Sequence, residues 1–154
     1  MRASYLIPAC LIPVYLALAA CGGENSTAPV ATAPAVPPPA LSDLPAPWNS
    51  ADLASGKAAF GKCRSCHTTG AGQGNLVGPN LHGVFDRHPG SAQNFRYSAA
   101  MQAFAEEKWT PDLVDHWLSK PKDFLPGTSM FFDGIANENE RRDLIGFLLI
   151  ESRK

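Results

Sequence analysis

After residue 50, apolar residues recur at steps of three and four, which is the spacing of helices that bury one face. A first helix is expected over residues 51–62, with Ser50 as its N-cap. Its apolar face carries Leu53, Gly56 and Phe60. Glycine inside a helix costs up to about 1 kcal/mol relative to alanine. Gly56 therefore indicates a place where another helix crosses closely.

Two more helices are expected in the middle of the chain. Residues 97–105 predict a short helix with Met101 and Phe104 turned inward. Thr110 and Pro111 begin the next helix, because threonine caps a helix and proline suits its first position. The apolar positions of this helix, which ends before Pro121, are Leu113, Val114, Trp117 and Leu118.

The last helix is expected over residues 138–151. Asn137 to Glu140 resembles a capping box, with asparagine in place of serine or threonine. One side of the helix carries Leu144, Phe147, Leu148 and Glu151, flanked by Ile145 and Leu149. This face fits packing against the Gly56 face of the first helix. Because no segment of the domain alternates as a strand would, the expected fold class is all-α.

The N-terminal third has a different pattern. Residues 1–20 place Arg2 before an apolar run, as in a secretory signal peptide. A membrane-spanning helix is the alternative, but Pro8 and Pro13 would break its hydrogen bonds. Leu18-Ala19-Ala20-Cys21 resembles the bacterial lipobox, in which cleavage precedes a cysteine that becomes lipidated. An ordinary signal peptide with an incidental cysteine is the other interpretation.

Residues 21–47 are expected to be a lipid-anchored linker rich in proline and alanine. Seven prolines lie between Thr27 and Pro47, and such a segment favours polyproline II over a packed core. It is either a stiff tether that lifts a domain off a membrane or a spacer of no particular length. Both interpretations place the folded domain at residues 48–154.

Composition and charge mainly exclude some classes of function. The formal net charge of the 154 residues is −1, which gives no case for binding nucleic acid. Of the 13 basic residues only Arg2 precedes Trp48, and of the 14 acidic ones only Glu24 and Asp43 do. The domain is therefore close to neutral, and its length suits one domain.

The chemistry is concentrated in Cys63-Arg64-Ser65-Cys66-His67, the C-x-x-C-H signature of c-type haem attachment. Two thiols on one helical turn can each add to a vinyl group of one porphyrin, and the following histidine lies under the iron. A redox cysteine pair or half of a zinc site are the alternatives, but a zinc site needs two more ligands. The glycine-rich loop of residues 68–90 is long enough to wrap a cofactor.

The sixth ligand of such an iron decides between small-molecule binding and electron transfer. The candidates are His82, His88, His116, Met101 and Met130. Met130 lies on a loop between two expected helices, which can present its side chain to an iron. Met101 lies on an apolar helix face, where methionine is most often core filler. Spacing favours Met130 and leaves the others open.

Several motifs in order resemble a class I cytochrome c of the mitochondrial and bacterial type. Besides C-x-x-C-H these are residues 78–83 (GPNLHG), Trp109, Pro121-Lys122 and residues 126–130 (PGTSM), so the resemblance covers about residues 52–151. It implies the class I cytochrome c fold, in which the N- and C-terminal helices cross and loops enclose one covalent haem c.

The resemblance also implies roles for individual residues. Cys63 and Cys66 would form the thioethers, and His67 and Met130 would be the axial ligands. The carbonyl of Pro79 would accept the other ring N–H of His67. Three further residues correspond to positions that contact the haem propionates: Arg87, Tyr97 and Trp109. Phe132 corresponds to a position that covers the haem edge.

The chain departs from the mitochondrial pattern around the expected haem. Met101 stands near an asparagine position and Trp117 at a tyrosine position, so the surroundings of Met130 differ. Ser129 and Asp123 replace lysines, which leaves few cations near the haem edge: Lys62, Arg64, Lys120 and Lys122.

The expected function is that of a one-electron carrier, not an enzyme, and a monomer is expected. A haem enzyme or gas-binding protein with a labile Met130, or the haem subunit of one respiratory complex, are the alternatives. A bc-type complex, a terminal oxidase or a periplasmic reductase would be the redox partner. The leader places the protein on the periplasmic side of a bacterial membrane, held by a lipid; an uncleaved N-terminal anchor or a soluble periplasmic form are the alternatives.

Overall fold

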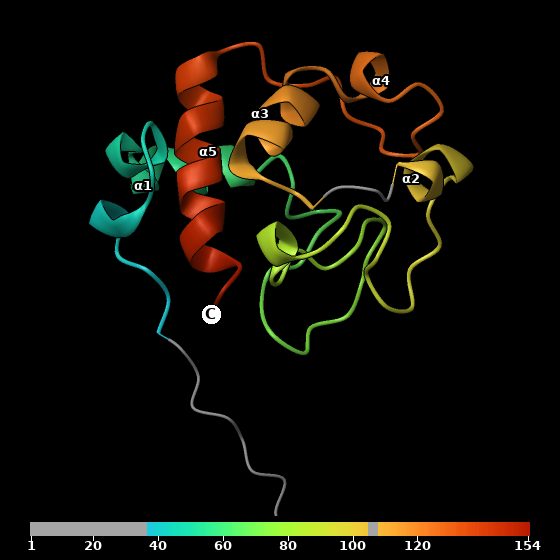
Figure 1. The fold of residues 1–154 in the computed structure, drawn as a ribbon, viewed down its shortest axis with the longest axis horizontal. Coiled ribbons are helices and arrows are strands. Elements are labelled where there is room, and N and C mark those ends of the chain that lie inside the picture. The colour runs from blue at the N-terminus through green and yellow to red at the C-terminus, as the bar shows by residue number, and fades with distance from the viewer. Residues whose placement is uncertain (1–36, 105–107) are drawn as a thin grey trace, which may run out of the picture. The chain divides into compact units, whose positions relative to one another are not determined.

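The computed structural model describes residues 37–104 and 108–154. These residues form five α-helices and three short 3₁₀ turns, and no strand occurs among them, which confirms the all-α fold class. The α-helices are α1 (Leu53–Phe60), α2 (Ala99–Ala103), α3 (Pro111–Ser119), α4 (Pro121–Phe124) and α5 (Glu138–Glu151). The 3₁₀ turns are η1 (Leu41–Asp43), η2 (Trp48–Ser50) and η3 (Val84–Asp86). Figure 1 shows α1 and α5 on one side of the domain and α2 and α4 on the other.

The first helix begins later than its sequence suggests. Asp52, not Ser50, is the N-cap, and its carboxylate accepts hydrogen bonds from the backbone N–H groups of Ala54 and Ser55, both at 2.9 Å. These two bonds lower the pKa of Asp52, since they favour its charged form. Ser50 instead ends η2, where its hydroxyl donates to the carbonyl of Pro47.

The closest approach in the fold is the crossing of α1 and α5 at Gly56. A Cβ on Gly56 would overlap the carbonyl oxygen of Asp143 and approach the side chain of Phe147. Next to the crossing, the rings of Phe60 and Phe147 lie 5.7 Å apart. The expected packing of the terminal helices is therefore confirmed, and Gly56 is glycine because α5 occupies the space of a side chain.

The N-terminus of α5 forms half of the expected capping box. The Asn137 side chain accepts from the backbone N–H groups of Asn139 and Glu140. The Glu140 carboxylate does not return to Asn137 but forms an ion pair with Lys62. This pair links the first turn of α5 to the residue that precedes Cys63.

The helices between α1 and α5 differ from expectation in length and number. The third begins and ends as predicted, with Val114, Trp117 and Leu118 buried. The second is shorter than residues 97–105 and begins after Ser98, whose hydroxyl caps Met101 N. The single turn of α4 was not predicted, because four residues are too few to show a helical period.

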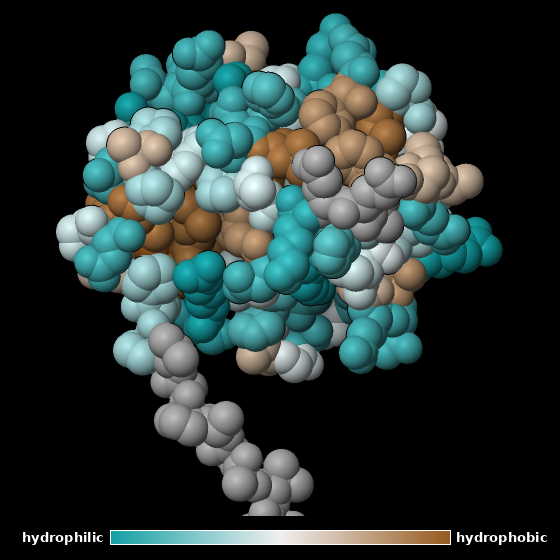
Figure 2. Space-filling view, viewed as in Figure 1, coloured by the Kyte–Doolittle hydropathy of each residue, from teal (hydrophilic) through white to brown (hydrophobic). Residues whose placement is uncertain are grey.

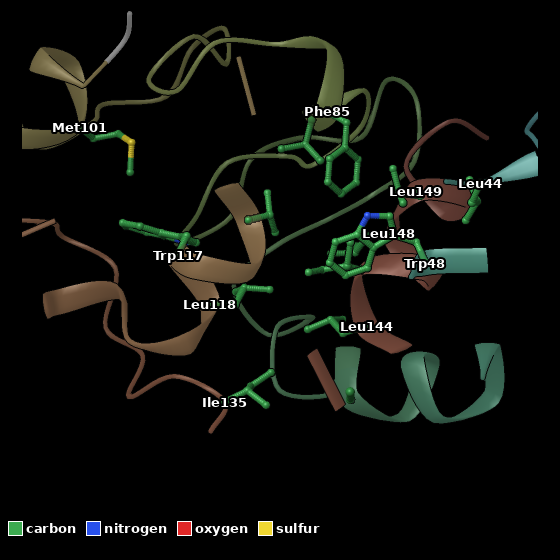
Figure 3. Close-up of a cluster of buried hydrophobic side chains, with 14 residues drawn as sticks. Leu44, Trp48, Phe85, Met101, Trp117, Leu118, Ile135, Leu144, Leu148 and Leu149 are labelled. Atoms are coloured by element: carbon green, nitrogen blue, oxygen red, sulfur yellow. The ribbon is translucent and has the colours of Figure 1, made fainter. Parts of the chain in front are cut away.

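The end of the linker belongs to the core. Leu44 and Trp48 are buried, although both precede the first α-helix (Figure 3). Gly146 on α5 leaves room for this segment, since a Cβ there would overlap Ala51 and lie 3.2 Å from the carbonyl oxygen of Trp48. The proline content had placed the end of the expected linker at residue 47. The structure shows instead that Leu44, within that linker, already packs with the helices.

The surface seen in Figure 2 is mainly hydrophilic, with separate small hydrophobic areas on it. Among the described residues, no helix has the length and the run of apolar residues that a membrane crossing requires. The expected signal peptide (residues 1–20), the lipidation site Cys21 and the linker up to residue 36 lie outside the described residues.

Replacing Gly56 by alanine tests the crossing. Because the new Cβ meets the backbone of α5, which cannot rotate away, we expect Gly56→Ala to lower the free energy of unfolding by about 2–3 kcal/mol. Guanidinium unfolding followed by far-UV circular dichroism measures this change. Gly74→Ala is the matched control: open space surrounds Gly74, so a change below about 0.5 kcal/mol is expected. Equal losses in both variants would contradict the role of Gly56.

Candidate functional site

One cavity of about 220 Å³ lies between the helices and the loops. Its lining is mostly apolar and comes from the end of α1, the loop of residues 77–88, α2, α3, the loop of residues 128–132 and α5. All nine residues that the sequence assigns to cofactor binding line it: Cys63, Cys66, His67, Pro79, Arg87, Tyr97, Trp109, Met130 and Phe132. The fold thus gathers into one place residues that are spread over most of the domain.

The two cysteines are presented by a continuation of α1. Successive turns carry backbone bonds from Cys63 N to the Phe60 carbonyl (2.8 Å) and from Cys66 N to the Cys63 carbonyl (2.9 Å). Both thiols are free, so they do not form a disulfide with each other. Burial raises the pKa of Cys63 to about 11, which keeps that thiol neutral at physiological pH.

His67 is fixed by a bond to the loop that faces it. Its Nδ1–H donates to the carbonyl oxygen of Pro79 at 2.7 Å. This tautomer leaves Nε2 with a free lone pair, which is the form that binds a metal. Burial lowers the pKa of His67, and the bond to Pro79 partly opposes the shift, so the imidazole is held neutral.

Gly78 allows that loop to approach the imidazole. A Cβ on Gly78 would overlap the His67 ring, and Gly78 N donates to the Cys66 carbonyl at 2.8 Å. The loop is held in turn by Asn80, whose amide donates to the carbonyls of Gly70 and Gln73. In the sequence Asn80 stands out only as part of the motif at residues 78–83, because a side chain that ties a loop together leaves no periodic pattern.

Met130 reaches the cavity from a turn. Thr128 N donates to the Leu125 carbonyl, and Gly127 takes φ +88°, a conformation that favours glycine. The hydroxyl of Thr128 then accepts from Met130 N at 3.2 Å. Two of the other ligand candidates, Met101 and His88, also line the cavity, whereas His82 and His116 do not.

The polar groups of the lining are few and partly occupied. Arg87 donates to the carbonyl of Asn80 at 2.8 Å, and the Tyr97 hydroxyl accepts from Ala92 N at 3.2 Å. Burial raises the pKa of Tyr97, which therefore keeps its proton and can donate a hydrogen bond. A cation and a phenol at one apolar cavity suit the carboxylates of a propionate-bearing group.

The apolar wall contains residues that sequence patterns did not connect with the site. Leu144 and Leu148 of α5 and Val114 and Leu118 of α3 had been identified only as the buried faces of helices, whereas Trp117 had also been expected near Met130. Val84 and Phe85 were missed because their loop has no period. Trp117 packs between Trp109 and Phe124, with ring centroids at 5.7 and 5.9 Å.

This set of residues fits a covalent haem. Two free thiols lie next to an imidazole with an available Nε2, a thioether lines the same cavity, and the walls are apolar. The residues that would hold the haem are Cys63 and Cys66 through thioethers and His67 through Nε2.

Comparison with known proteins gives a consistent result. The model of the family described as "Cytochrome c" matches residues 53–150. The chain is 37% identical to a cytochrome c of Kluyveromyces lactis over 107 residues, covering 69% of this chain and 96% of that protein. It is 39% identical to a cytochrome c2 of Blastochloris viridis, covering 67% and 80% of the two chains. Cytochrome cH from Methylobacterium extorquens superposes with a TM-score of 0.58 at 35% identity, covering 63% and 96%.

Removing both thiols tests the mode of attachment. We expect the wild-type chain, matured with haem, to keep its colour through acid–acetone extraction, since thioether bonds survive that treatment. The double variant Cys63→Ala/Cys66→Ala should lose all extractable haem, and either single variant should keep it through the remaining bond. Intact-protein mass spectrometry after extraction measures this. Haem retained by the double variant would show that the two cysteines do not carry it.

Proposed function

The chain belongs to the cytochrome c family, and from this we propose that it is a membrane-tethered, periplasmic electron carrier in which His67 and Met130 ligate one haem c. Family membership itself shows that the chain binds one covalent haem c and takes part in haem-based electron transfer, as an electron carrier and not as an enzyme. The membrane tether, the periplasmic location and the ligand pair of His67 and Met130 go beyond what family membership shows.

The observation that carries the ligand assignment is the position of four side chains on one cavity: Cys63, Cys66, His67 and Met130. When bound, haem iron supplies a one-electron couple, and histidine with methionine as axial ligands raises its potential. The bond between His67 and Pro79 holds the imidazole in its metal-binding tautomer. The turn at Gly127 and the hydroxyl of Thr128, which accepts from Met130 N, hold the backbone from which the Met130 side chain reaches the cavity.

The cavity wall favours electron transfer over chemistry on a bound substrate. Met101, Trp117, Leu144 and Leu148 present carbon and sulfur to the cavity, which excludes water from it. A peroxidase would need a histidine or arginine placed as an acid–base group near an open ligand position. Arg87 is instead held by the carbonyl of Asn80, and His88, which also lines the cavity, is solvent-exposed.

The tether part of the proposal rests on residues 1–47 of the sequence. The lipobox-like Leu18–Cys21 and the following prolines support an anchor and a stiff linker. The described end of the linker is consistent with this, because residues 37 and 38 are exposed before Leu44 enters the core. Tethering would raise the effective concentration of the carrier near membrane partners such as a bc-type complex, a terminal oxidase or a reductase.

Met130→Ala tests the ligand pair. Removing the thioether should open the sixth position, so the reduced variant binds carbon monoxide rapidly and its visible spectrum shifts, whereas the wild type reacts slowly. Met101→Leu is the matched control, since it removes the other thioether of the cavity and should keep the wild-type spectrum. A spectral change in Met101→Leu with none in Met130→Ala would reassign the ligand. Rapid carbon monoxide binding by the wild type would favour a gas-binding protein.

Cys21→Ser tests the anchor. We expect the wild-type chain, expressed in a bacterium that processes lipoproteins, to sediment with membranes and to carry an acylated cysteine at its N-terminus. Cys21→Ser should lose acylation, whereas Cys10→Ser should behave as the wild type because Cys10 lies within the leader. Fractionation and mass spectrometry measure both properties. A wild-type chain cleaved elsewhere and free of lipid would contradict the tether.

A further inference from the structure

Three large hydrophobic side chains are exposed among the described residues: Leu76 (50%), Val77 (81%) and Phe131 (91%). Two of them, Val77 and Phe131, line the cavity that holds Cys63 and His67. They come from different loops, one just before Gly78 and the other just after Met130. The exposed apolar side chains are therefore not scattered, and two of the three share the rim of the haem cavity.

The backbone on both sides of this rim is tied down. Leu76 N donates to the Gly78 carbonyl at 2.9 Å, which closes a turn with Val77 at its tip. Phe131 follows Met130, whose backbone N–H is held by Thr128. Val77 and Phe131 are thus presented by ordered backbone, so burying them against a partner costs little additional loop ordering.

Two of the four cations expected near the haem edge, Lys62 and Lys120, form ion pairs within the chain, and a third, Lys122, lies over an aromatic ring. Lys62, which lines the cavity, is paired with Glu140. Lys120 is paired with Asp123, and the Lys122 ammonium lies 4.5 Å from the centre of the Phe131 ring. An acidic partner would have to compete with these internal contacts, in a domain with equal numbers of acidic and basic residues.

We propose that the rim formed by Val77 and Phe131 is a docking surface that binds its redox partner by apolar contact. The partner it fits presents an uncharged, apolar surface around its own redox centre. This inference rests on the proposed function and adds the chemistry of the interface. An exposed aromatic side chain on ordered backbone is the type of residue that carries binding energy in protein interfaces.

Salt dependence distinguishes this surface from a charged one. Attraction between exposed charges weakens as salt shortens the screening length, which is about 10 Å at 0.1 M and 3 Å at 1 M. Apolar contact is not weakened by salt in this way. The proposed interface should therefore persist at an ionic strength that releases a carrier bound by lysines.

Because the partner is unidentified, monolayers on gold electrodes serve as the probe. One monolayer ends in mixed methyl and hydroxyl groups and the other in carboxylates. Cyclic voltammetry measures the adsorbed, electroactive amount of the haem-loaded chain beginning at Gly22, which carries neither the apolar leader nor the proposed lipid that would itself bind the methyl groups. We expect the methyl/hydroxyl film to bind the carrier equally at 0.01 and about 0.5 M salt. Phe131→Ser should lower the apparent affinity for that film about tenfold, the effect of removing one buried aromatic contact.

Two controls accompany Phe131→Ser. Ala58→Ser changes an exposed apolar residue on α1 that does not line the cavity, and its affinity should equal that of the wild type. Lys122→Gln removes the cation over the Phe131 ring, and we expect binding to the methyl/hydroxyl film to be retained. Each variant is compared with the wild type by its visible spectrum, so that damage to the haem site is recognised.

Three results would overturn the proposal. Stronger binding to the carboxylate film, lost at high salt and insensitive to Phe131→Ser, would show a charged docking surface. A concentration-dependent dimer in analytical ultracentrifugation that Phe131→Ser abolishes would show that the rim binds a second copy of the chain. If a mediated redox titration in solution finds no reversible one-electron couple, the proposed function itself fails. If the couple is reversible and either of the first two results is obtained, only the inference about the rim fails.

Discussion

The crossing of α1 and α5 at Gly56 is the constraint on which the site depends. The end of α1 leads through Lys62 into Cys63, and the same stretch of α5 supplies Leu144 and Leu148 to the cavity wall. A change in the distance between these helices would move the thiols relative to the wall opposite them. The backbones of the two helices pack directly against each other at Gly56, so their separation is set by van der Waals contact of backbone atoms and not by adaptable side chains.

The loops that complete the site, unlike its helical wall, are built without regular secondary structure. These loops depend on single hydrogen bonds. His67 donates to the carbonyl of Pro79, Asn80 donates to the carbonyls of Gly70 and Gln73, and the backbone N–H of Met130 donates to the Thr128 hydroxyl. Such bonds are individually modest, but together they fix loops that no helix or sheet supports. The same loops carry the ligand candidates and the exposed rim, so one set of bonds orders both.

Sequence patterns predicted the helices well where the period was long and the caps were clear. The helix after Thr110 and the helix after Asn137 begin as their capping residues indicate. Ser50 and Asp52 are both good caps two residues apart, and only the tertiary bond from Asp52 N to the Asp143 carboxylate favours the second. Val84 and Phe85 had no detectable pattern because their burial comes from the cavity. The nine residues expected to bind the cofactor, all of which line one cavity, were predicted from motifs and from the family resemblance, which encode chemistry that periodicity does not.

The buried linker end has a mechanical consequence. Along α5, residues 144 and 148 lie on one side and residue 146 on nearly the opposite side, since each residue turns the helix by about 100°. The first pair lines the cavity, and Gly146 accommodates the segment of Trp48 and Ala51. Tension on the chain that precedes Leu44 is therefore borne first by the buried Leu44 and Trp48 and by the side of α5 that carries Gly146. The loops around His67 and Met130 lie behind the helix and are shielded from that load.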